Sequence, residues 1–231
     1  MKKVVFLSDF FANQIQGGAE IYDDILISCI EDRGNKVVKF RCSEFTIKHL
    51  DLYLKTGFNF IISNFVSLSE DVKKKIQIYG ERYVILEHDH KYLSNRNPAD
   101  FKDFIAPKHF IINRGFYSSA NKVLCQSSKH KEVLEKNLGI SNAVSLGCSL
   151  WSKEQIQIIR NSVKEKNNKA FILDDPNPIK GKVKSISFCE KKNFDYDIVP
   201  KKPYKEFIET LASYDKLVFF PSTLESFCRL A

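Results

Sequence analysis

Short apolar runs alternate with amphipathic stretches along almost the whole chain, and this alternation limits the possible folds more than any other feature. The runs are rich in Val, Ile, Leu and Phe, as expected for strands buried on both faces of a sheet. They span Lys3–Ser8, Lys36–Arg41, Phe58–Ser63, Tyr83–Glu87, Val123–Gln126, Ala143–Leu146, Ala170–Leu173, Tyr196–Val199 and Lys216–Phe220. Strands that alternate with helices favour a mostly parallel sheet covered on both faces, so we expect an α/β fold.

The stretches between these strands predict helices, because their apolar residues recur with the helical period. They span Ala19–Arg33, Phe45–Leu54, Glu70–Tyr79, a stretch from about Asn113, a segment capped by Ser127 or Ser128 that runs to Leu138, and Pro203–Tyr214. In the first of these helices the expected apolar face is Ile21, Tyr22, Ile25, Leu26, Cys29 and Ile30. The polar segment Ser152–Lys169 is expected to be a connecting helix. This order predicts two Rossmann-like halves, residues 1–150 and residues 151–231.

The composition is that of a globular chain. With 43% hydrophobic and 28% charged residues, the 231 residues can build cores for two modest α/β domains. No apolar run approaches the ~18–20 residues needed to span a bilayer. Six cysteines lie far apart, without a Cys-x-x-Cys pair or zinc-site spacing, which suits reduced thiols in a cytoplasmic protein.

The formal net charge of +8 can be explained in several ways. It could attract an anionic partner such as nucleic acid or a membrane surface. However, the lysine-rich pieces Lys73–Lys75, Lys191-Lys192 and Lys201-Lys202 are short and scattered, which favours an ordinary solvated surface. No recognition-helix, zinc-finger or aromatic RNA-binding motif is present, so we expect no specific nucleic-acid partner. A nucleotide-sugar donor or an anionic acceptor would also explain part of the charge, and the scattered lysines would allow peripheral contact with an anionic membrane.

A glycine pair lies between the first strand and the first helix, in the sequence Gly17-Gly18-Ala19-Glu20. Glycine lets the backbone approach a ligand closely, and a helix N-terminus offers unpaired N–H groups to an anion. The spacing differs from the Gly-x-Gly-x-x-Gly of dinucleotide-binding turns. The local sequence leaves a ligand-binding turn and an ordinary flexible loop equally open.

Two further strand ends carry candidate residues. Glu87-His88-Asp89-His90 follow the fourth strand, at the carboxyl edge where open α/β sheets bind ligands. An imidazole beside carboxylates can do acid–base or hydrogen-bonding work, which favours His88 more than His90; the alternative is a solvated polar loop. Lys180-Gly181 follow a turn-rich loop after Ala170–Leu173, and a lysine there could neutralise a phosphate. The alternative for Lys180 is an unspecialised surface lysine.

The closing segment combines a strand end with a helix start. The predicted strand Lys216–Phe220 ends at Pro221-Ser222. An apolar segment then begins with the sequence Ser222-x-x-Glu225. This spacing is a capping box, a structural device that contributes about 1 kcal/mol. A functional interpretation has the Glu225 carboxylate bind sugar hydroxyls, while the N–H groups of the helix start bind phosphate.

The sequence Asp195-Tyr196-Asp197 has the Asp-x-Asp spacing of a metal site that occurs in one class of sugar-transferring enzymes. It starts a strand instead of following one, so a structural role is favoured and no metal site is predicted.

In their order along the chain, these motifs resemble the retaining glycosyltransferases of the GT-B fold, family 4 in the classification of sugar-transferring enzymes. The glycine pair, His88-Asp89 and Val123-Leu124-Cys125-Gln126-Ser127 stand in the first half. Lys180-Gly181 and Pro221-Ser222-x-x-Glu225-Ser226-Phe227 stand in the second. The last element resembles the opening of that family's Glu-x7-Glu motif and is the most specific part.

The resemblance implies transfer of a sugar from a nucleotide-diphosphate donor to a carbohydrate or lipid-linked acceptor, with retained anomeric configuration and without a metal or other cofactor. It implies that Gly17 and Gly18 offer N–H groups to the diphosphate and that His88 contacts the sugar or the leaving phosphate. Lys180 would neutralise the diphosphate. Glu225 would bind the sugar, with the N–H groups of Ser226 and Phe227 on phosphate.

Two departures from the family pattern bear on activity. The family usually carries an arginine six residues before this lysine, and here that position is Asp174, a carboxylate that would repel a diphosphate. The second glutamate of Glu-x7-Glu would fall just past Ala231, so we expect a C-terminally truncated chain with weak or no turnover. The main alternative is a non-catalytic module, derived from a transferase fold, that binds a nucleotide or a partner chain.

Overall fold

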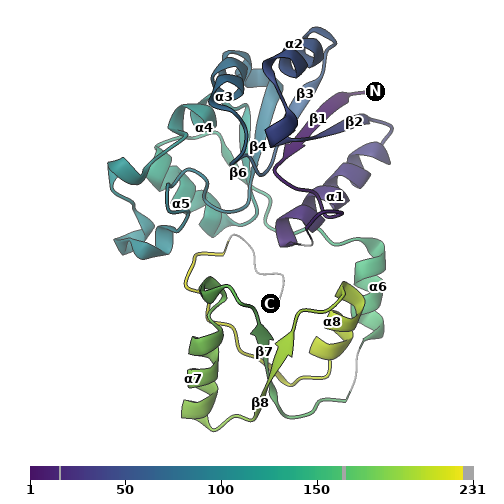
Figure 1. Cartoon of the computed structure of the whole chain (residues 1–231), viewed down its shortest axis with the longest axis vertical. Helices are drawn as coiled ribbons and strands as arrows, with labels where there is room; N and C mark the ends of the chain where they lie inside the picture. Colours follow the sequence, from purple (N-terminus) through teal and green to yellow (C-terminus); the bar gives the residue numbers. More distant parts are fainter. Residues whose placement is uncertain (16, 163–164, 226–231) are drawn as a thin grey trace. The chain divides into compact units, whose positions relative to one another are not determined.

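Two parallel β-sheets, one of six strands and one of three, divide the chain into two units (Figure 1). The computed structural model describes residues 1–15, 17–162 and 165–225. The first unit comprises Met1–Leu150 together with Glu225, and the second comprises Trp151–Leu224. The division therefore falls where the polar segment begins, close to residue 150.

The first unit is an α/β fold around a six-stranded sheet. Its strands are β1 (Lys3–Ser8), β2 (Lys36–Arg41), β3 (Asn59–Ile62), β4 (Tyr83–Glu87), β5 (Lys122–Cys125) and β6 (Ala143–Ser145). Its α-helices are α1 (Gly18–Glu31), α2 (Ile47–Lys55), α3 (Glu70–Ile76), α4 (Arg114–Ser119) and α5 (Ser128–Leu138). Short 3₁₀ helices are η1 (Cys42–Glu44), η2 (Gln77–Arg82), η3 (Pro98–Asp100), η4 (Lys102–Phe104) and η5 (Lys108–Phe110). The strand order is β2-β1-β3-β4-β5-β6, and neighbouring strands pair in parallel.

The sheet of the first unit has an apolar core on each face. Successive residues of a strand point to opposite faces, and β1 shows this directly. Leu7 packs in the larger core with Ile85, whereas its neighbour Phe6 packs with Tyr22 of α1 and with Leu86. Because both faces are covered, nearly every residue of β1 must be apolar, which explains the continuous apolar runs of the sequence.

The second unit contains a three-stranded parallel sheet in the order β8-β7-β9. Its elements are α6 (Lys153–Asn161), β7 (Ala170–Asp174), η6 (Pro178–Lys180), α7 (Lys182–Lys192), β8 (Tyr196–Pro200), α8 (Tyr204–Leu211) and β9 (Lys216–Leu217). On one face, Ile172 packs with Cys189 of α7 and with Val218. On the other face, the Phe171 ring makes edge contacts with Phe207 of α8 and with Tyr214.

The structure confirms the predicted α/β class and much of the element order. Strands Lys3–Ser8, Lys36–Arg41 and Tyr83–Glu87 agree with the prediction residue for residue. The predicted strand Lys216–Phe220 is too long, because the chain leaves β7 after Val218 and turns toward η6. The Val218 N–H still donates to the Phe171 carbonyl at 3.0 Å, but the Ser222 N–H donates to the Ile179 carbonyl at 2.8 Å.

Two helices also differ from expectation. The connecting helix α6 ends at Asn161, well short of the predicted Lys169, and Asn168 has a left-handed backbone with φ of 59°. Helix α7 was not predicted as a bounded element, since the apolar residues among its many lysines are few.

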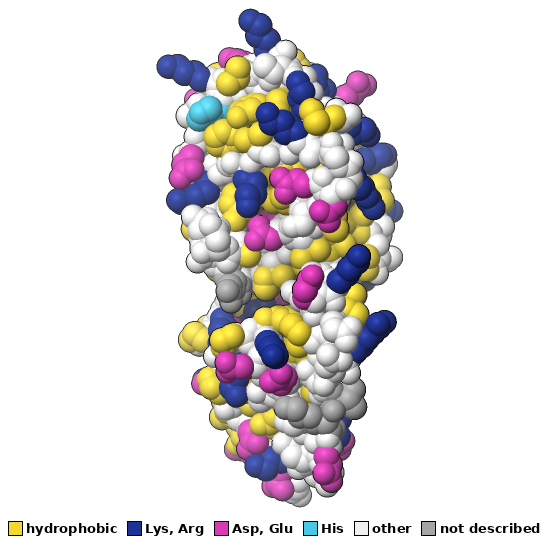
Figure 2. All heavy atoms as spheres, turned by 90° about the vertical axis from the view of Figure 1, so that its right-hand side faces the viewer, with side chains coloured by type: hydrophobic (Ala, Val, Ile, Leu, Met, Phe, Trp, Pro, Cys, Tyr) yellow, Lys and Arg dark blue, Asp and Glu magenta, His cyan; other side chains and the backbone are white. Residues whose placement is uncertain are grey.

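Three of the five described cysteines, Cys42, Cys125 and Cys189, are buried, and all five are free thiols. Cys148 is exposed, and so is Cys29, which the sequence placed on the apolar face of the first helix. On the face drawn in Figure 2, basic and acidic side chains are interspersed over each unit, with no broad patch of one sign. Within the ranges that the structure describes, no helix is both long and apolar enough to cross a bilayer.

Candidate functional site

A buried polar cluster lies at the carboxyl edge of the first unit's sheet. From β1 the chain continues to β2 on one side, and it later returns to place β3 on the other side of β1. The carboxyl ends of strands beside such a switch point are where open α/β sheets bind ligands. Ser8 ends β1, Ser63 follows β3, His88 follows β4 and Asp23 belongs to α1. We call these four residues the Asp23 cluster.

Asp23 is the centre of this cluster. Its Oδ2 accepts a hydrogen bond from Ser8 Oγ at 3.1 Å, and its Oδ1 accepts one from Ser63 Oγ at 2.9 Å. The same Oδ1 lies 3.2 Å from Nε2 of His88. Asp23, Ser8 and Ser63 are fully buried. A buried carboxylate is tolerated only with such partners, so the cluster ties α1 to the ends of three strands.

The His88 ring is packed as well as hydrogen-bonded. Its centroid lies 5.4 Å from that of Tyr22, with an interplanar angle of 73°, an edge-to-face contact. Only 3% of the side chain is exposed, so a ligand can reach no more than an edge of the ring. The alternative interpretation of His88 as part of a solvated loop is wrong, since His90 and Lys91 are buried too.

The glycine pair lies at the start of α1, in the same unit. Gly17 is the N-cap residue and Gly18 the first helical residue, and no side chain of the described residues caps this end. A Cβ at Gly17 would collide with the Glu20 carboxylate. Glu20 accepts a hydrogen bond from Asn64 Nδ2 at 3.4 Å. Burial raises the pKa of Glu20, and the carboxylates of Asp23 and Asp89 add to this effect.

Glu20 has two consequences for ligand binding. It lies one turn before Asp23 in α1, and its partner Asn64 directly follows Ser63, so the first turn of α1 is next to the Asp23 cluster. As an ionised group in the first turn, Glu20 would compete with an anionic ligand for the helix N–H groups; its raised pKa weakens this competition.

Next to this cluster, Glu87 and Lys91 form a buried ion pair that sequence reasoning missed. Lys91 Nζ lies 3.2 Å from Glu87 Oε1, and both side chains are almost fully buried. The Tyr117 hydroxyl donates to Glu87 Oε2. Although burial opposes ionisation, Lys91 and the Tyr117 hydroxyl hold the pKa of Glu87 well below its ordinary value. The pair shapes the loop that follows β4, because Glu87 Oε1 also accepts from the N–H groups of Asp89 and Lys91.

A pair of histidine rings packs against this loop. The centroids of His90 and His130 are 4.5 Å apart, and His90 Nδ1 lies 3.0 Å from the Tyr92 hydroxyl. His130 belongs to α5 and is 1% exposed. Neither of its ring nitrogens has a hydrogen-bond partner among the described residues. Burial lowers the pKa of His130 to about 3, with a further contribution from His90.

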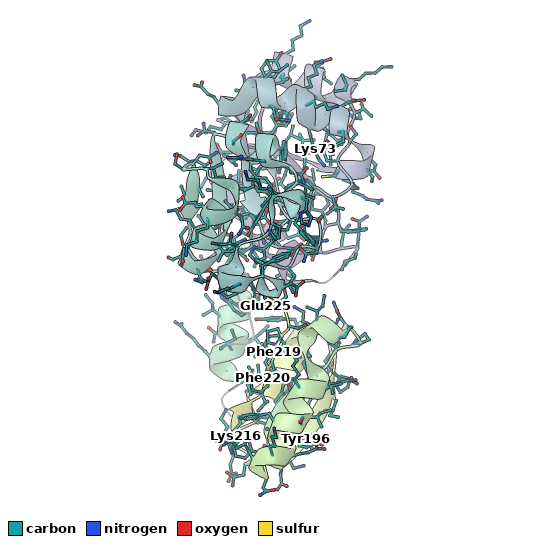
Figure 3. The ribbon with its side chains drawn as sticks, turned by 90° about the vertical axis from the view of Figure 1, so that its left-hand side faces the viewer. Lys73, Tyr196, Lys216, Phe219, Phe220 and Glu225 are labelled. Carbon is teal, nitrogen blue, oxygen red and sulfur yellow. The ribbon has the colours of Figure 1, made fainter. Side chains whose placement is uncertain are left out.

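In the second unit, Lys180 and Gly181 form the turn between β7 and α7. Lys180 ends η6, and Gly181 has φ of 71°, a conformation that favours glycine. A Cβ at Gly181 would collide with the Phe220 carbonyl. Together with the Ser222–Ile179 hydrogen bond, this close approach places the segment after β9 beside the turn. Figure 3 shows Phe219 and Phe220 at the opposite end of the unit from Lys216 and Tyr196.

Asp174 and Asp175, at the end of β7, are each paired with a lysine. Lys182 Nζ lies 2.8 Å from Asp174 Oδ1, and Lys201 Nζ lies 3.1 Å from Asp175 Oδ2. Although burial opposes ionisation of Asp175, the Asn177 N–H and Lys201 lower its pKa. Neither lysine was predicted from the sequence as a site residue, and Lys201 was considered only as part of a short lysine-rich piece. The signal for Lys182 was its position, directly after Gly181 at the start of α7.

The predicted site residues lie in both units of the chain. Glu225 is half-buried and is grouped with the first unit, as are Gly17, Gly18 and His88, whereas Lys180 belongs to the second. Ser226 and Phe227 lie outside the described residues. Residues 221–225 are not helical, so the prediction that a helix begins directly after Ser222 is wrong, and the rest of that predicted segment lies outside the described residues. In the Asp-x-Asp sequence, Asp197 has a structural partner, Lys169 Nζ at 3.0 Å.

No protein-family model matches the chain, and no curated protein matches it.

Proposed function

We propose that this chain is a glycosyltransferase that moves a sugar from a nucleotide-diphosphate donor to a carbohydrate or lipid-linked acceptor, with retention of anomeric configuration. The observation that carries the proposal is the turn at the carboxyl end of β7. There, the positive end of α7, the Lys180-Gly181 pair and the segment around Ser222 lie together. Such a turn suits a diphosphate.

The chemistry of the leaving group explains why cations are needed at this turn. When the bond to the sugar breaks, negative charge accumulates on the nucleoside diphosphate, and fixed positive groups stabilise that charge. Lys180 supplies such a group, and the N–H groups at the α7 N-terminus supply a dipole. Lys182 offsets the negative charge of Asp174, which lies at the same turn. No acidic residue lies in the first turn of α7.

Asp174 is compatible with this proposal. A bare carboxylate at the end of β7 would repel a diphosphate, but Lys182 at 2.8 Å balances its charge. Asp175 is balanced in the same way by Lys201. The paired carboxylates then fix the positions of two lysines in place of the arginine expected from the family pattern.

For the first unit taken by itself, the family resemblance assigns a sugar contact to His88 and phosphate contacts to the N–H groups of Gly17 and Gly18. The uncapped start of α1 and the Asp23 cluster at the switch point support this assignment. Glu225 would bind the sugar, and the N–H groups of Ser226 and Phe227 would bind phosphate.

Calorimetric titration with UDP, GDP and ADP, each against its monophosphate, tests the proposal. We expect at least one diphosphate to bind at least tenfold more tightly than its monophosphate, a difference of about 1.4 kcal/mol. Lys180→Ala should remove that preference, whereas Lys184→Ala, an exposed lysine of the same helix, should keep it. If none of the three diphosphates binds in preference to its monophosphate, the proposal is wrong.

One observation favours a second candidate, a non-catalytic module that binds a nucleotide or a partner chain. The side chain of His88 is only 3% exposed, which suits a structural role in the Asp23 cluster. The two candidates differ in turnover. A transferase releases nucleoside diphosphate from a nucleotide sugar that it binds, and His88→Gln slows this release; a binding module holds the nucleotide sugar intact.

A further inference from the structure

We propose that Asp23 is a positioning residue that holds the proton of the neutral His88 imidazole on Nε2 and so makes Nδ1 a hydrogen-bond acceptor for a ligand hydroxyl. The geometry of the Asp23 cluster points to this assignment. Its functional consequence rests on the proposed function, in which His88 contacts the substrate. The protonation pattern itself does not depend on any ligand.

The hydrogen bonds that Asp23 receives define its role. Both of its oxygens accept from serine hydroxyls, Ser8 on Oδ2 and Ser63 on Oδ1. An ionised carboxylate can only accept hydrogen bonds. The third group within reach is His88 Nε2, at 3.2 Å from Oδ1, and it must therefore act as the donor. With the proton on Nε2, the neutral ring carries its free electron pair on Nδ1.

The ring has little freedom to present its other face or edge. Asp23 is fully buried in α1, and two strand ends hold it through Ser8 and Ser63. Tyr22, its neighbour in α1, packs edge-to-face against the imidazole at 5.4 Å. Residues 22 and 23 of one helix thus fix both the plane of the ring and the position of its proton.

This protonation pattern selects between the two ligand groups that His88 could contact. A neutral ring with an acceptor at Nδ1 can bind a sugar hydroxyl, which donates, but not the oxygens of a fully ionised phosphate, which only accept. The contact would therefore be with a hydroxyl of the transferred sugar. Phosphate contacts would be left to backbone N–H groups and lysines.

The ¹⁵N chemical shifts of the His88 ring report the position of the proton, because a protonated nitrogen and a bare one resonate far apart. The chain is labelled with ¹⁵N-histidine, and His88 is identified among the five histidines by the signal lost in His88→Gln. The spectrum is recorded at about pH 8.5, two units above the ordinary histidine pKa. We expect Nε2 to be protonated and Nδ1 bare. A proton on Nδ1 in the unmodified chain would overturn the proposal without any variant.

Two variants separate positioning from a loss of structure. In Asp23→Asn the side-chain amide can donate to Nε2, so the proton of His88 should move to Nδ1, at least in a substantial fraction. Ser63→Ala removes another partner of Asp23 but keeps the Asp23–His88 pair, so the proton should stay on Nε2. Asp32→Asn, the same change at the exposed end of α1, should also leave it there. If the folded Asp23→Asn chain retains an Nε2 proton in full, Asp23 does not position the ring. No nucleotide enters this experiment, so its result is independent of donor binding.

Discussion

Asp174 Oδ1 lies 2.8 Å from Lys182 Nζ, across the turn that joins β7 to α7. The two residues sit on either side of Lys180 and Gly181, so the pair brackets the turn where we place the diphosphate. Both side chains are more than a third exposed, and solvent screening makes the pair a minor contributor to stability. Its effect is expected in the affinity for an anion instead.

Lys182→Ala should weaken diphosphate binding about tenfold, or ~1.4 kcal/mol, because it removes one cation and leaves Asp174 unbalanced. Asp174→Ala should strengthen binding. The double variant should bind more tightly than Lys182→Ala alone, since the repelling carboxylate is gone. Calorimetric titration measures all three, with Lys184→Ala as the control. Equal affinities for Lys182→Ala and the double variant would mean that Asp174 does not repel the ligand.

Breaking the buried Glu87–Lys91 ion pair of the first unit should strongly lower the free energy of unfolding. Lys91→Met leaves the Glu87 carboxylate buried beside Tyr117 without its cation, and such a loss costs about 3–5 kcal/mol. Lys131→Met breaks an ion pair with Glu135 that is also spaced by four residues but is partly exposed. That change should cost only about 0.5 kcal/mol. Urea unfolding of both variants gives the comparison, and similar losses would show that the Glu87–Lys91 pair is not desolvated.

The stability of the first unit should fall as the pH falls from about 6.5. Burial lowers the folded-state pKa of His130 to about 3, from an ordinary value near 6.5. In this interval the unfolded chain binds a proton that the folded chain refuses, so acid favours unfolding. The limiting slope for one proton is about 1.4 kcal/mol per pH unit. Measurements above pH 5 avoid Glu87, whose lowered pKa makes it a further source of acid instability only below about 4.5.

Urea midpoints at pH 7, 6 and 5 test this prediction. His130→Phe should flatten the dependence on pH, because the group that titrates on unfolding is absent. His109→Phe changes an exposed histidine and should keep the original slope. A slope unaffected by His130→Phe would contradict the assignment of His130 as a buried neutral ring.

Gly181→Ala should destabilise the second unit more than backbone strain alone explains. The left-handed conformation by itself costs alanine about 1–2 kcal/mol, and the collision with the Phe220 carbonyl adds a further 1–3 kcal/mol or so. Gly34 is the matched control, with φ of 74° and nothing within 4 Å of an added Cβ. Hydrogen exchange of the β7 and β1 amides measures the loss in each unit separately. Equal losses would mean that Phe220 does not approach Gly181.

Strands such as Tyr83–Glu87 could be predicted because burial on both faces leaves an unbroken apolar run, which is visible locally. The Asp23 cluster could not be predicted, since the partners of Asp23 lie 15, 40 and 65 residues away along the chain. The sequence offered one signal for the burial of Asp23. Asp23 stands four residues before Ile27, and both are buried, so α1 turns a carboxylate toward the sheet. The predicted apolar face, which included Ile25 and Cys29, therefore differs from the face that is buried, which includes Asp23 and Ile27.

The candidate residues of the second unit show the same limit. A turn at Lys180-Gly181 could be predicted because a glycine after a strand marks a turn in the local sequence. The φ of 71° at Gly181 agrees with that prediction. The ion pair between Asp174 and Lys182 could not be predicted, because the two residues are eight apart and their contact depends on how the turn folds. Asp174 alone looked repulsive, whereas Asp174 with Lys182 is neutral.

The proposed function requires the turn after β7 to bind a nucleoside diphosphate. Two-dimensional ¹H–¹⁵N spectra recorded during titration with UDP, GDP or ADP report on this binding residue by residue. We expect saturable shifts of the Gly181, Lys182 and Ser222 amides, with Lys192, at the other end of α7, unaffected. Binding of a diphosphate that leaves these three amides unmoved, or no binding of any of the three, would contradict the proposed function.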